Sequence, residues 1–218
     1  LVAAPRQEEL LPADIEGMTI PYRTLGKSGT DEFVVQKSRF IGIAVPVQEE
    51  AQALEVIAQA KSAYRGANHH CFAYVIGANA GVMRYSDDGE PSGTAGLPMM
   101  EVLKQRQLVN CCVVVVRYFG GIHLGAGGLV RAYTKGCVIG LDAAGAVTMA
   151  PSQRVRLRVP YPQWDKVQHA MKALPVLPEA SEYAESVSTT YLVRNEHSDD
   201  VQLQIAEATD GQAEMIGA

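Results

Sequence analysis

Three features are missing from this 218-residue sequence, and each absence narrows what the chain can encode. No run of about 18 apolar residues occurs, so no membrane-spanning helix is expected. The first 18 residues lack the basic, apolar and small-residue order of a secretory signal peptide, and we expect residues 1–30 to form a polar leader. The four cysteines include no CxxC pair, so we expect reduced thiols in the cytoplasm rather than disulfides.

Common catalytic motifs are missing as well. The stretch "LGKSGT" at residues 25–30 ends like a phosphate-binding P-loop, but Pro21 stands where the first glycine belongs. The glycine-rich stretch 121–130 has Val130 in place of the third glycine of GxGxxG, and no GxSxG elbow occurs. The triplet "HHC" at residues 69–71 has no second Cys/His pair at zinc-site spacing. We therefore expect no metal and no cofactor.

The charge balance excludes a protein that coats nucleic acid over its whole surface, because the net charge is −5. The two parts of the chain differ. Residues 33–150 carry 10 Lys and Arg against 8 Asp and Glu, a net charge of +2. Residues 151–218 carry 6 against 10, a net charge of −4. Any anionic partner is therefore expected to meet the first part.

The hydrophobic pattern predicts an α+β protein of two domains, residues 31–147 and 151–218, with a break in the pattern at 145–153. In the first domain the predicted elements are a strand at 31–47 bent near 37–39, a helix at 48–65, a hairpin at 69–77 and 81–86, a helix at 97–107, a buried strand at 109–119, and a helix at 129–145. The second domain follows the order βαββαβ, which is the ferredoxin-like arrangement.

Two predicted helices have a distinctive face. In the helix at 129–145, alanine or glycine recurs every four residues, and this stripe predicts close approach to a sheet (Ala132, Gly136, Gly140, Ala144). In the helix at 48–65, the spacing predicts one buried face (Ala51, Leu54, Ile57, Ala58). The adjacent Cys111 and Cys112 lie in an apolar run, and we expect them to be small core residues on opposite faces of a strand.

The loop "YSDDGEPSGTAGLP" at residues 85–98 cannot be a helix interior or a regular strand. It places Asp87, Asp88 and Glu90 within four residues, among three glycines and a proline. Such a loop either makes a difficult turn or holds something. Neighbouring carboxylates also suit acid–base work, because one of them can have a raised pKa.

A second notable stretch begins where the predicted strand ends at Arg117. A glycine-rich loop and a helix start follow, and free backbone N–H groups at such a junction bind anions. Arg131 near the helix start opposes the helix dipole, which an intervening anion would relieve, and Lys135 lies on the same side. The alternative is that Arg117 and Arg131 pair with the acidic residues of the loop at 85–98.

Together, four motifs resemble the IMPACT/YigZ family: "KSRFIG" (37–42), "HHC" (69–71), "SDDGEPSGTAGLP" (86–98) and "VVVVRYFGGIHLGAGGLVRAY" (113–133). The resemblance implies a first domain with a left-handed βαβ unit, similar to domain IV of elongation factor G, and a ferredoxin-like second domain similar to domains III and V of that factor. It marks a signature set in this chain: His70, Asp87, Asp88, Gly89, Glu90, Pro91, Gly93, Thr94 and Gly96. It also implies association with nucleic acid or ribosomes, and a role in translation regulation known from eukaryotic relatives.

Two functional hypotheses remain. The first is a cytoplasmic module that binds RNA, a ribosomal particle or a translation-related protein. Its binding residues would be Lys37, Arg39, Arg117, Tyr118, Gly120, Gly121, Gly125, Gly127, Gly128, Arg131, Tyr133 and Lys135, with Phe119 as a further stacking face. The second is an enzyme for a phosphorylated or peptide-like small molecule, with an acid of the loop and one of His69, His70 or His123 moving a proton. The sequence favours the binding module, because no nucleophile–base pair and no metal site can be recognised in the sequence.

Overall fold

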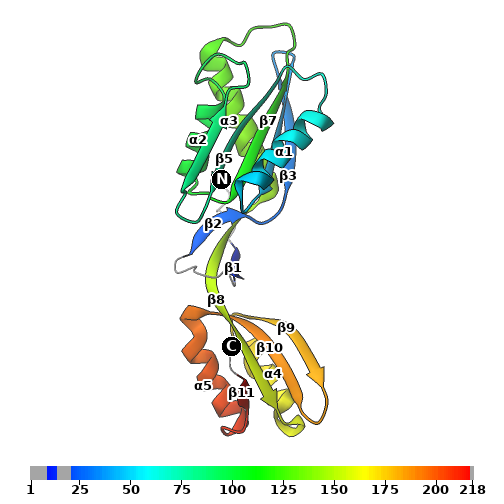
Figure 1. The fold of residues 1–218 in the computed structure, drawn as a ribbon, viewed down its shortest axis with the longest axis vertical. Helices are drawn as coiled ribbons and strands as arrows, with labels where there is room; N and C mark the ends of the chain where they lie inside the picture. The colour runs from blue at the N-terminus through cyan, green and yellow to red at the C-terminus, as the bar shows by residue number, and fades with distance from the viewer. Residues whose placement is uncertain (1–8, 14–20, 217–218) are drawn as a thin grey trace, which may run out of the picture. The chain divides into compact units, whose positions relative to one another are not determined.

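The structure is a computed structural model that describes residues 9–13 and 21–216. The chain forms two compact units, one containing Tyr22–Thr148 and the other containing the chain from Met149 onward. The expected class, α+β with two domains, is confirmed (Figure 1). No helix in the described part of the chain is long and apolar enough to cross a membrane.

The first unit is built on a five-stranded sheet of order β3-β4-β7-β5-β6, in which all neighbours are antiparallel. The strands are β3 (Gly29–Val35), β4 (Ser38–Pro46), β5 (His69–Ile76), β6 (Val82–Ser86) and β7 (Cys111–Tyr118). The prediction of one bent strand at 31–47 is wrong. Gln36 and Lys37 have φ angles of 45° and 64°, so they form a two-residue turn that folds β3 back onto β4.

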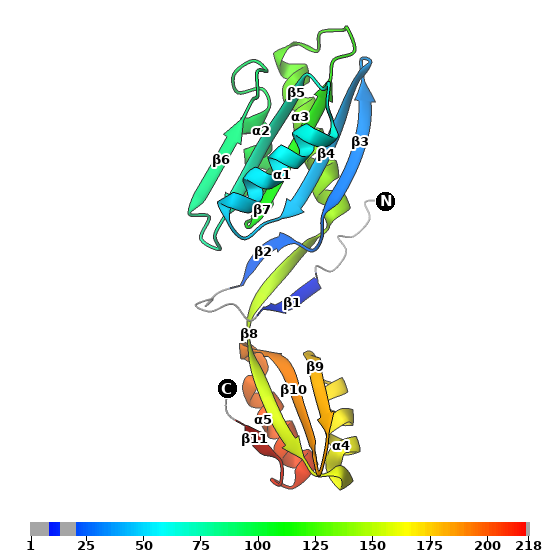
Figure 2. The same cartoon turned by 45° about the vertical axis from the view of Figure 1, so that its right-hand side comes forward.

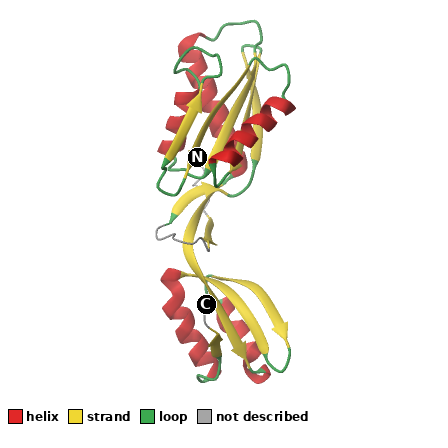
Figure 3. Cartoon of the chain, in the orientation of Figure 1, coloured by secondary structure: helices red, strands yellow, loops and turns green. Residues whose placement is uncertain are grey.

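Helices cover both faces of this sheet (Figures 2 and 3). Helix α1 (Glu50–Ala63) packs on one face, and α2 (Gly96–Gln105) and α3 (Gly125–Ala144) lie on the other. The central strand β7 is therefore buried from Cys111 to Arg117. Strands β6 and β7 are both antiparallel to β5 between them, and with α2 they form the expected left-handed βαβ unit (Figure 2).

The predicted face of α1 is wrong at three of its four positions, because Ile57 is buried as expected but Ala51, Leu54 and Ala58 are exposed. The helix buries Ala53, Ile57 and Ala60, whereas Leu54 is 54% exposed. Residues 53, 57 and 60 follow the i, i+4, i+7 spacing as well as the predicted set does. Only the sheet decides which of the two stripes is covered, and Cys112, Val114 and Val116 of β7 cover this one.

Helix α3 begins at Gly125, four residues earlier than predicted, so part of the expected glycine loop is its first turn. The small-residue stripe approaches the sheet as expected. A Cβ atom on Gly136 would lie 2.8 Å from Cγ1 of Val115, and one on Gly140 would lie 2.9 Å from the backbone of Gly42. Any larger side chain at these positions would separate the helix from the sheet.

Part of the expected polar leader is folded. Strand β2 (Tyr22–Leu25) pairs with β8 (Ala146–Val159), and Tyr22 and Leu25 are buried. The hydroxyl of Thr24 donates to the carbonyl of Asn110 at 3.1 Å. The burial of these side chains explains why residues 22–30 are not a leader. Strand β1 (Glu9–Ala13) also pairs with β8, and leader residues 1–8 and 14–20 lie outside the described residues.

The second unit has the expected ferredoxin-like order. After β8 come α4 (Tyr161–Lys172), β9 (Val176–Tyr183), β10 (Val187–Arg194), a 3-10 turn (Asn195–His197), α5 (Ser198–Thr209) and β11 (Glu214–Ile216). The strands run antiparallel in the order β11-β8-β10-β9. Trp164, Val167 and Met171 of α4 enter its core. The stretch 145–153 is not irregular, because β8 runs through it from Ala146.

Candidate functional site

The acidic loop after β6 is organised by Asp87. Its Oδ1 accepts the backbone N–H groups of Ala95 at 3.0 Å and Gly96 at 2.8 Å, and its Oδ2 accepts that of Gly93 at 2.8 Å. These groups lie at or just before the start of α2, where backbone N–H groups have no partner within the helix. Asp87 therefore fixes the loop and stabilises the helix start, and none of its oxygens points to a ligand.

Asp88, the second acidic residue of the loop, contacts Lys61 and both adjacent histidines. Its Oδ2 accepts the backbone N–H of His70 at 2.7 Å, and its Oδ1 lies 3.4 Å from Nζ of Lys61. Its main-chain oxygen lies 2.9 Å from Nδ1 of His69. The His70 ring turns elsewhere, with Nε2 3.3 Å from the carbonyl of Tyr64. Of the two adjacent histidines, only His69 faces the cavity described below.

Glu90 is a buried carboxylate on which side chains from three segments converge. Its Oε1 accepts Nη1 of Arg117 at 2.6 Å and the hydroxyl of Tyr133 at 2.7 Å, and Nε2 of His69 lies 3.8 Å away. Glu90 is 8% exposed and Arg117 is 5% exposed. Burial raises the pKa of Tyr133 far above its usual range, so its hydroxyl stays protonated and donates to Glu90. Arg117 therefore pairs with an acid of the loop, one of the two alternatives that the sequence left open.

Aromatic rings hold the guanidinium of Arg117 in place. It lies 5.5 Å from the ring centroid of Phe40 and 5.4 Å from that of Phe119, and Nη2 is 3.5 Å from Oγ of Ser38. Nε of Arg117 is buried and has no hydrogen-bond partner.

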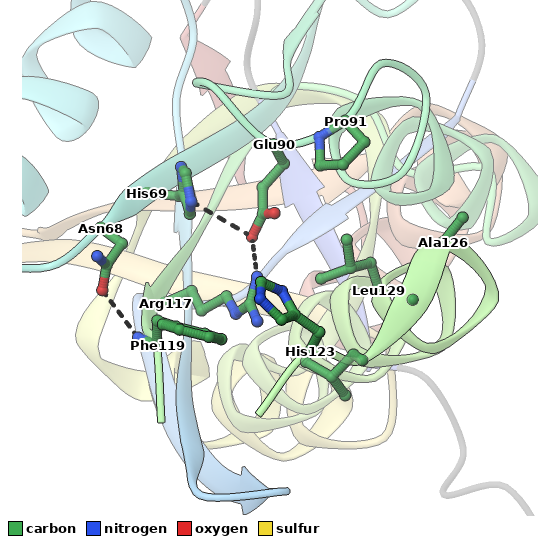
Figure 4. Close-up of a pocket in the computed structure, with 11 residues that line it drawn as sticks. Asn68, His69, Glu90, Pro91, Arg117, Phe119, His123, Ala126 and Leu129 are labelled. Carbon is green, nitrogen blue, oxygen red and sulfur yellow. Dashed lines mark hydrogen bonds and ion pairs between the residues drawn. The ribbon is translucent and has the colours of Figure 1, made fainter. Parts of the chain in front are cut away.

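A cavity of about 390 Å³ opens beside this cluster (Figure 4). It lies where β5 begins, β7 ends and α3 begins, and its lining combines charged or polar groups with apolar ones: Asn68, His69, Glu90, Pro91, Arg117, Phe119, His123, Leu124, Gly125, Ala126 and Leu129. Leu124 precedes the helix and offers no side-chain cap to its first N–H groups. The cavity thus combines an arginine and an open helix N-terminus, both of which attract anions.

The remaining predicted binding residues do not gather at this cavity. Arg39 pairs with Glu32 at 2.5 Å and lies over the Tyr118 ring, and Tyr118 packs into the core under α1. Lys135 lies 4.4 Å from the ring centroid of Phe33, and Phe33 stacks on Phe40. These residues lie on the face of the sheet opposite to Arg39 and Tyr118. Because successive side chains of a strand alternate between faces, the predicted cations do not form one surface.

The other predicted positions have mainly structural roles. Tyr133 is fully buried, so it offers no stacking face. Gly120 packs against the backbone of Lys37 so closely that no Cβ would fit, and Gly121 has a φ angle of 82°. Gly127 and Gly128 lie in the first turn of α3, and Arg131 is exposed on its second turn. Thr94 donates its hydroxyl to the carbonyl of Pro91 at 2.6 Å, which closes the acidic loop.

The sequence did not single out Asn68, Leu124, Ala126 or Leu129 as cavity residues. Asn68 accepts the backbone N–H of Phe119 at 2.8 Å and so ties the end of β7 to the start of β5. His69 was only one of three candidate histidines. The register of β5 against β7, which places His69 opposite Arg117, is the missing information.

Fold and cavity together define a class: a two-unit α+β protein whose first unit holds a buried acid–arginine pair beside an open helix N-terminus. The chain belongs to the IMPACT family. Residues 36–139 match the Impact N-terminal domain, and residues 157–212 match a domain of unknown function, DUF1949.

The chain is similar in sequence to proteins of this family, and the length of the match differs from one relative to another. The Bacillus subtilis IMPACT family member YvyE is 39% identical over 89% of this chain and 89% of its own length. The Escherichia coli member YigZ is 42% identical over 47% of this chain and 51% of its own length. The chain is also similar to a crystal structure of a hypothetical protein. The match covers 92% of this chain and 98% of that protein's chain, with a TM-score of 0.59 and 27% sequence identity.

Proposed function

We propose that the first unit is a receptor for a small anionic molecule, one that carries a carboxylate or phosphate group, and that the cavity beside Glu90 is its binding site. The observation that carries the proposal is that the buried Arg117 lines this cavity of about 390 Å³ at the open N-terminus of α3. Cavities of this size accept small molecules, whereas the backbone of a nucleic-acid duplex needs an open surface.

The cavity also has the means to take the rest of such a molecule. Phe119, Leu124 and Leu129 line it with apolar surface, and His69 and His123 add polar contacts. Phe119 is held between the guanidinium of Arg117 and the ring of His123, whose centroid lies 5.2 Å away. If the anionic group of the ligand lies at Arg117 and the helix N-terminus, the apolar part of the ligand would contact Phe119, Leu124 and Leu129.

Ala126 offers a direct test, because it is exposed, lines the cavity and lies in the first turn of α3. Glutamate at this position is favourable for the helix dipole, so Ala126→Glu should fold normally. Its carboxylate should abolish the rise in melting temperature that phosphate or carboxylate ligands give the parent protein. Ala126→Gln is the matched control of the same size and should keep most of the effect. Equal ligand stabilisation in the parent and in Ala126→Glu would place the anion elsewhere.

A second candidate function is association with RNA or a ribosomal particle in the cytoplasm, alone or with a translation-related protein. It is favoured by three exposed cations, Lys37, Arg39 and Arg131, which a single strand would have to reach from more than one face of the unit. On single-stranded RNA, about three phosphate contacts would give a slope of log affinity against log salt of roughly −2. Arg131→Ala should flatten that slope by about 0.7 and weaken binding to all sequences alike. Unchanged RNA binding in Ala126→Glu, together with lost anion binding, would separate the two functions.

A further inference from the structure

We infer that the cavity selects an anionic molecule that also carries a hydroxyl or N–H group next to its anionic group, and that His69 is the residue that recognises this hydrogen. The inference rests on the proposed function and narrows its ligand class. It follows from the contact that His69 makes on the side away from the cavity.

The protein determines which nitrogen of His69 carries hydrogen. Nδ1 lies 2.9 Å from the main-chain oxygen of Asp88, and a carbonyl oxygen can only accept. Nδ1 must therefore be the donor, and in the neutral ring Nε2 is left as an acceptor. The carbonyl is held firmly, since the Asp88 N–H is bound by Oγ of Ser86 at 3.1 Å and the Asp88 carboxylate is bound by the N–H of His70.

No side chain among the described residues supplies a hydrogen to Nε2. Its nearest charged neighbour is Oε1 of Glu90 at 3.8 Å, which is beyond hydrogen-bond distance, and a carboxylate oxygen is itself an acceptor. The hydrogens of Arg117 Nη1 and the Tyr133 hydroxyl are already directed at that oxygen. In the neutral ring, Nε2 of His69 therefore has no donor among the described side chains, and a ligand in the cavity that His69 lines can supply one.

The anionic group of the same ligand would lie nearby, because Arg117 and the start of α3 line the same cavity (Figure 4). One molecule can use both only if its donor is close to its negative charge. Small hydroxy acids and phosphate esters of polyols have this arrangement, whereas simple carboxylates and alkyl phosphates lack the donor. A site built around an unpaired acceptor discriminates against ligands that leave it unpaired.

The test uses pairs of probes that differ by one hydroxyl: lactate with propionate, and 2-hydroxypropyl phosphate with propyl phosphate. The parent protein should bind the hydroxylated member of at least one pair about tenfold more tightly by isothermal titration. In His69→Phe, the two probes of each pair should bind with similar affinity. His70 is the control, because its ring faces the Tyr64 carbonyl, and His70→Gln should keep the preference for the hydroxylated probe. Nitrogen-15 spectra of the free parent protein at pH 8 should show the ring hydrogen of His69 on Nδ1, a measurement that needs no variant.

Equal affinities within both pairs, or hydrogen on Nε2 of the neutral ring, would overturn the inference and leave the anion site intact. A chain that binds neither pair and shows no difference between the parent and Ala126→Glu would instead refute the proposed function, and the inference with it.

Discussion

Glu90 joins the acidic loop to the sheet and to α3 through a single carboxylate oxygen. A buried pair of charges contributes little net stability, but removing one partner leaves the other charge uncompensated. Arg117 has no other acid within reach among the described residues, because its remaining polar contact is Ser38. The stability of this region should therefore depend strongly on the carboxylate.

We expect Glu90→Gln to lower the free energy of unfolding by about 3 kcal/mol, because it leaves the Arg117 guanidinium buried without a counter-charge. Urea unfolding of this variant, of Arg117→Gln and of the double variant forms a thermodynamic cycle. The double variant should lose much less than the sum of the single losses. Additive losses would show that the two side chains do not interact in solution.

The four buried cysteines should make the free energy of unfolding fall as the pH rises into the alkaline range. Burial raises the pKa of Cys71 and of Cys111 to about 12 from an ordinary value of 9.0, and it also raises those of Cys112 and Cys137. The unfolded chain releases these protons first, so the stabilisation is complete below about pH 9 and is lost as the pH rises toward 12.

Each such thiol should therefore cost about 1.4 kcal/mol of stability per pH unit within this window. Urea unfolding at pH 8, 9 and 10 measures the effect, and Cys111→Ala should make the fall less steep. The same burial should protect all four thiols from alkylation in the native state at pH 8. Rapid labelling without denaturant would contradict the buried positions.

At the scale of elements, the contact of α3 with the sheet depends on the absence of side chains. Gly136 faces Val115 of β7 and Gly140 faces Gly42 of β4, so the backbones of helix and sheet are in direct contact. Each glycine lowers helix propensity by roughly 1 kcal/mol relative to alanine. The close packing offsets this cost and also holds Tyr133 against Phe40 and Glu90.

We expect Gly136→Leu to lower the free energy of unfolding by about 3 kcal/mol, because the side chain would overlap Val115. The exposed Gly127, which has open space around it apart from the Arg131 side chain, provides the control. Gly127→Ala should be neutral or slightly stabilising by thermal unfolding. Similar losses in both variants would mean that the stripe does not pack on the sheet.

At the scale of the whole molecule, the chain passes between its two units within a strand rather than through a loop. Strand β8 spans the boundary at Thr148 and Met149, and its residues from Ser152 to Val159 pair with β10. Domain boundaries usually lie in exposed, flexible segments that proteases cut first. This boundary should therefore resist cleavage.

Trypsin at low concentration should cut after Arg65 before it cuts after Arg156. Arg65 is exposed in the turn that follows α1, whereas Arg156 is paired with Thr190 in the centre of a sheet. Mass spectrometry of the first fragments measures the order. Early fragments that end at Arg156 would show that β8 opens readily.

The amino-acid sequence by itself determined the order and kind of most elements and the division into an α+β unit and a ferredoxin-like unit. The reason is that the alternation of apolar and polar residues, the positions of glycine and the small-residue stripe of α3 are local patterns. Such patterns favour a strand, a turn or a helix without reference to distant segments. The sequence also located the acidic loop and Arg117 as the unusual stretches of the first unit.

Tertiary structure decided which of these stretches meet. The register that sets His69 opposite Arg117, the fold-back that brings Glu90 to both, and the choice of the buried stripe on α1 are contacts between segments far apart in the chain. Local propensity cannot select among several equally well-spaced partners, because the choice depends on the packing of the whole sheet. For the same reason, the expected basic surface was divided between two faces, and a cavity appeared in its place.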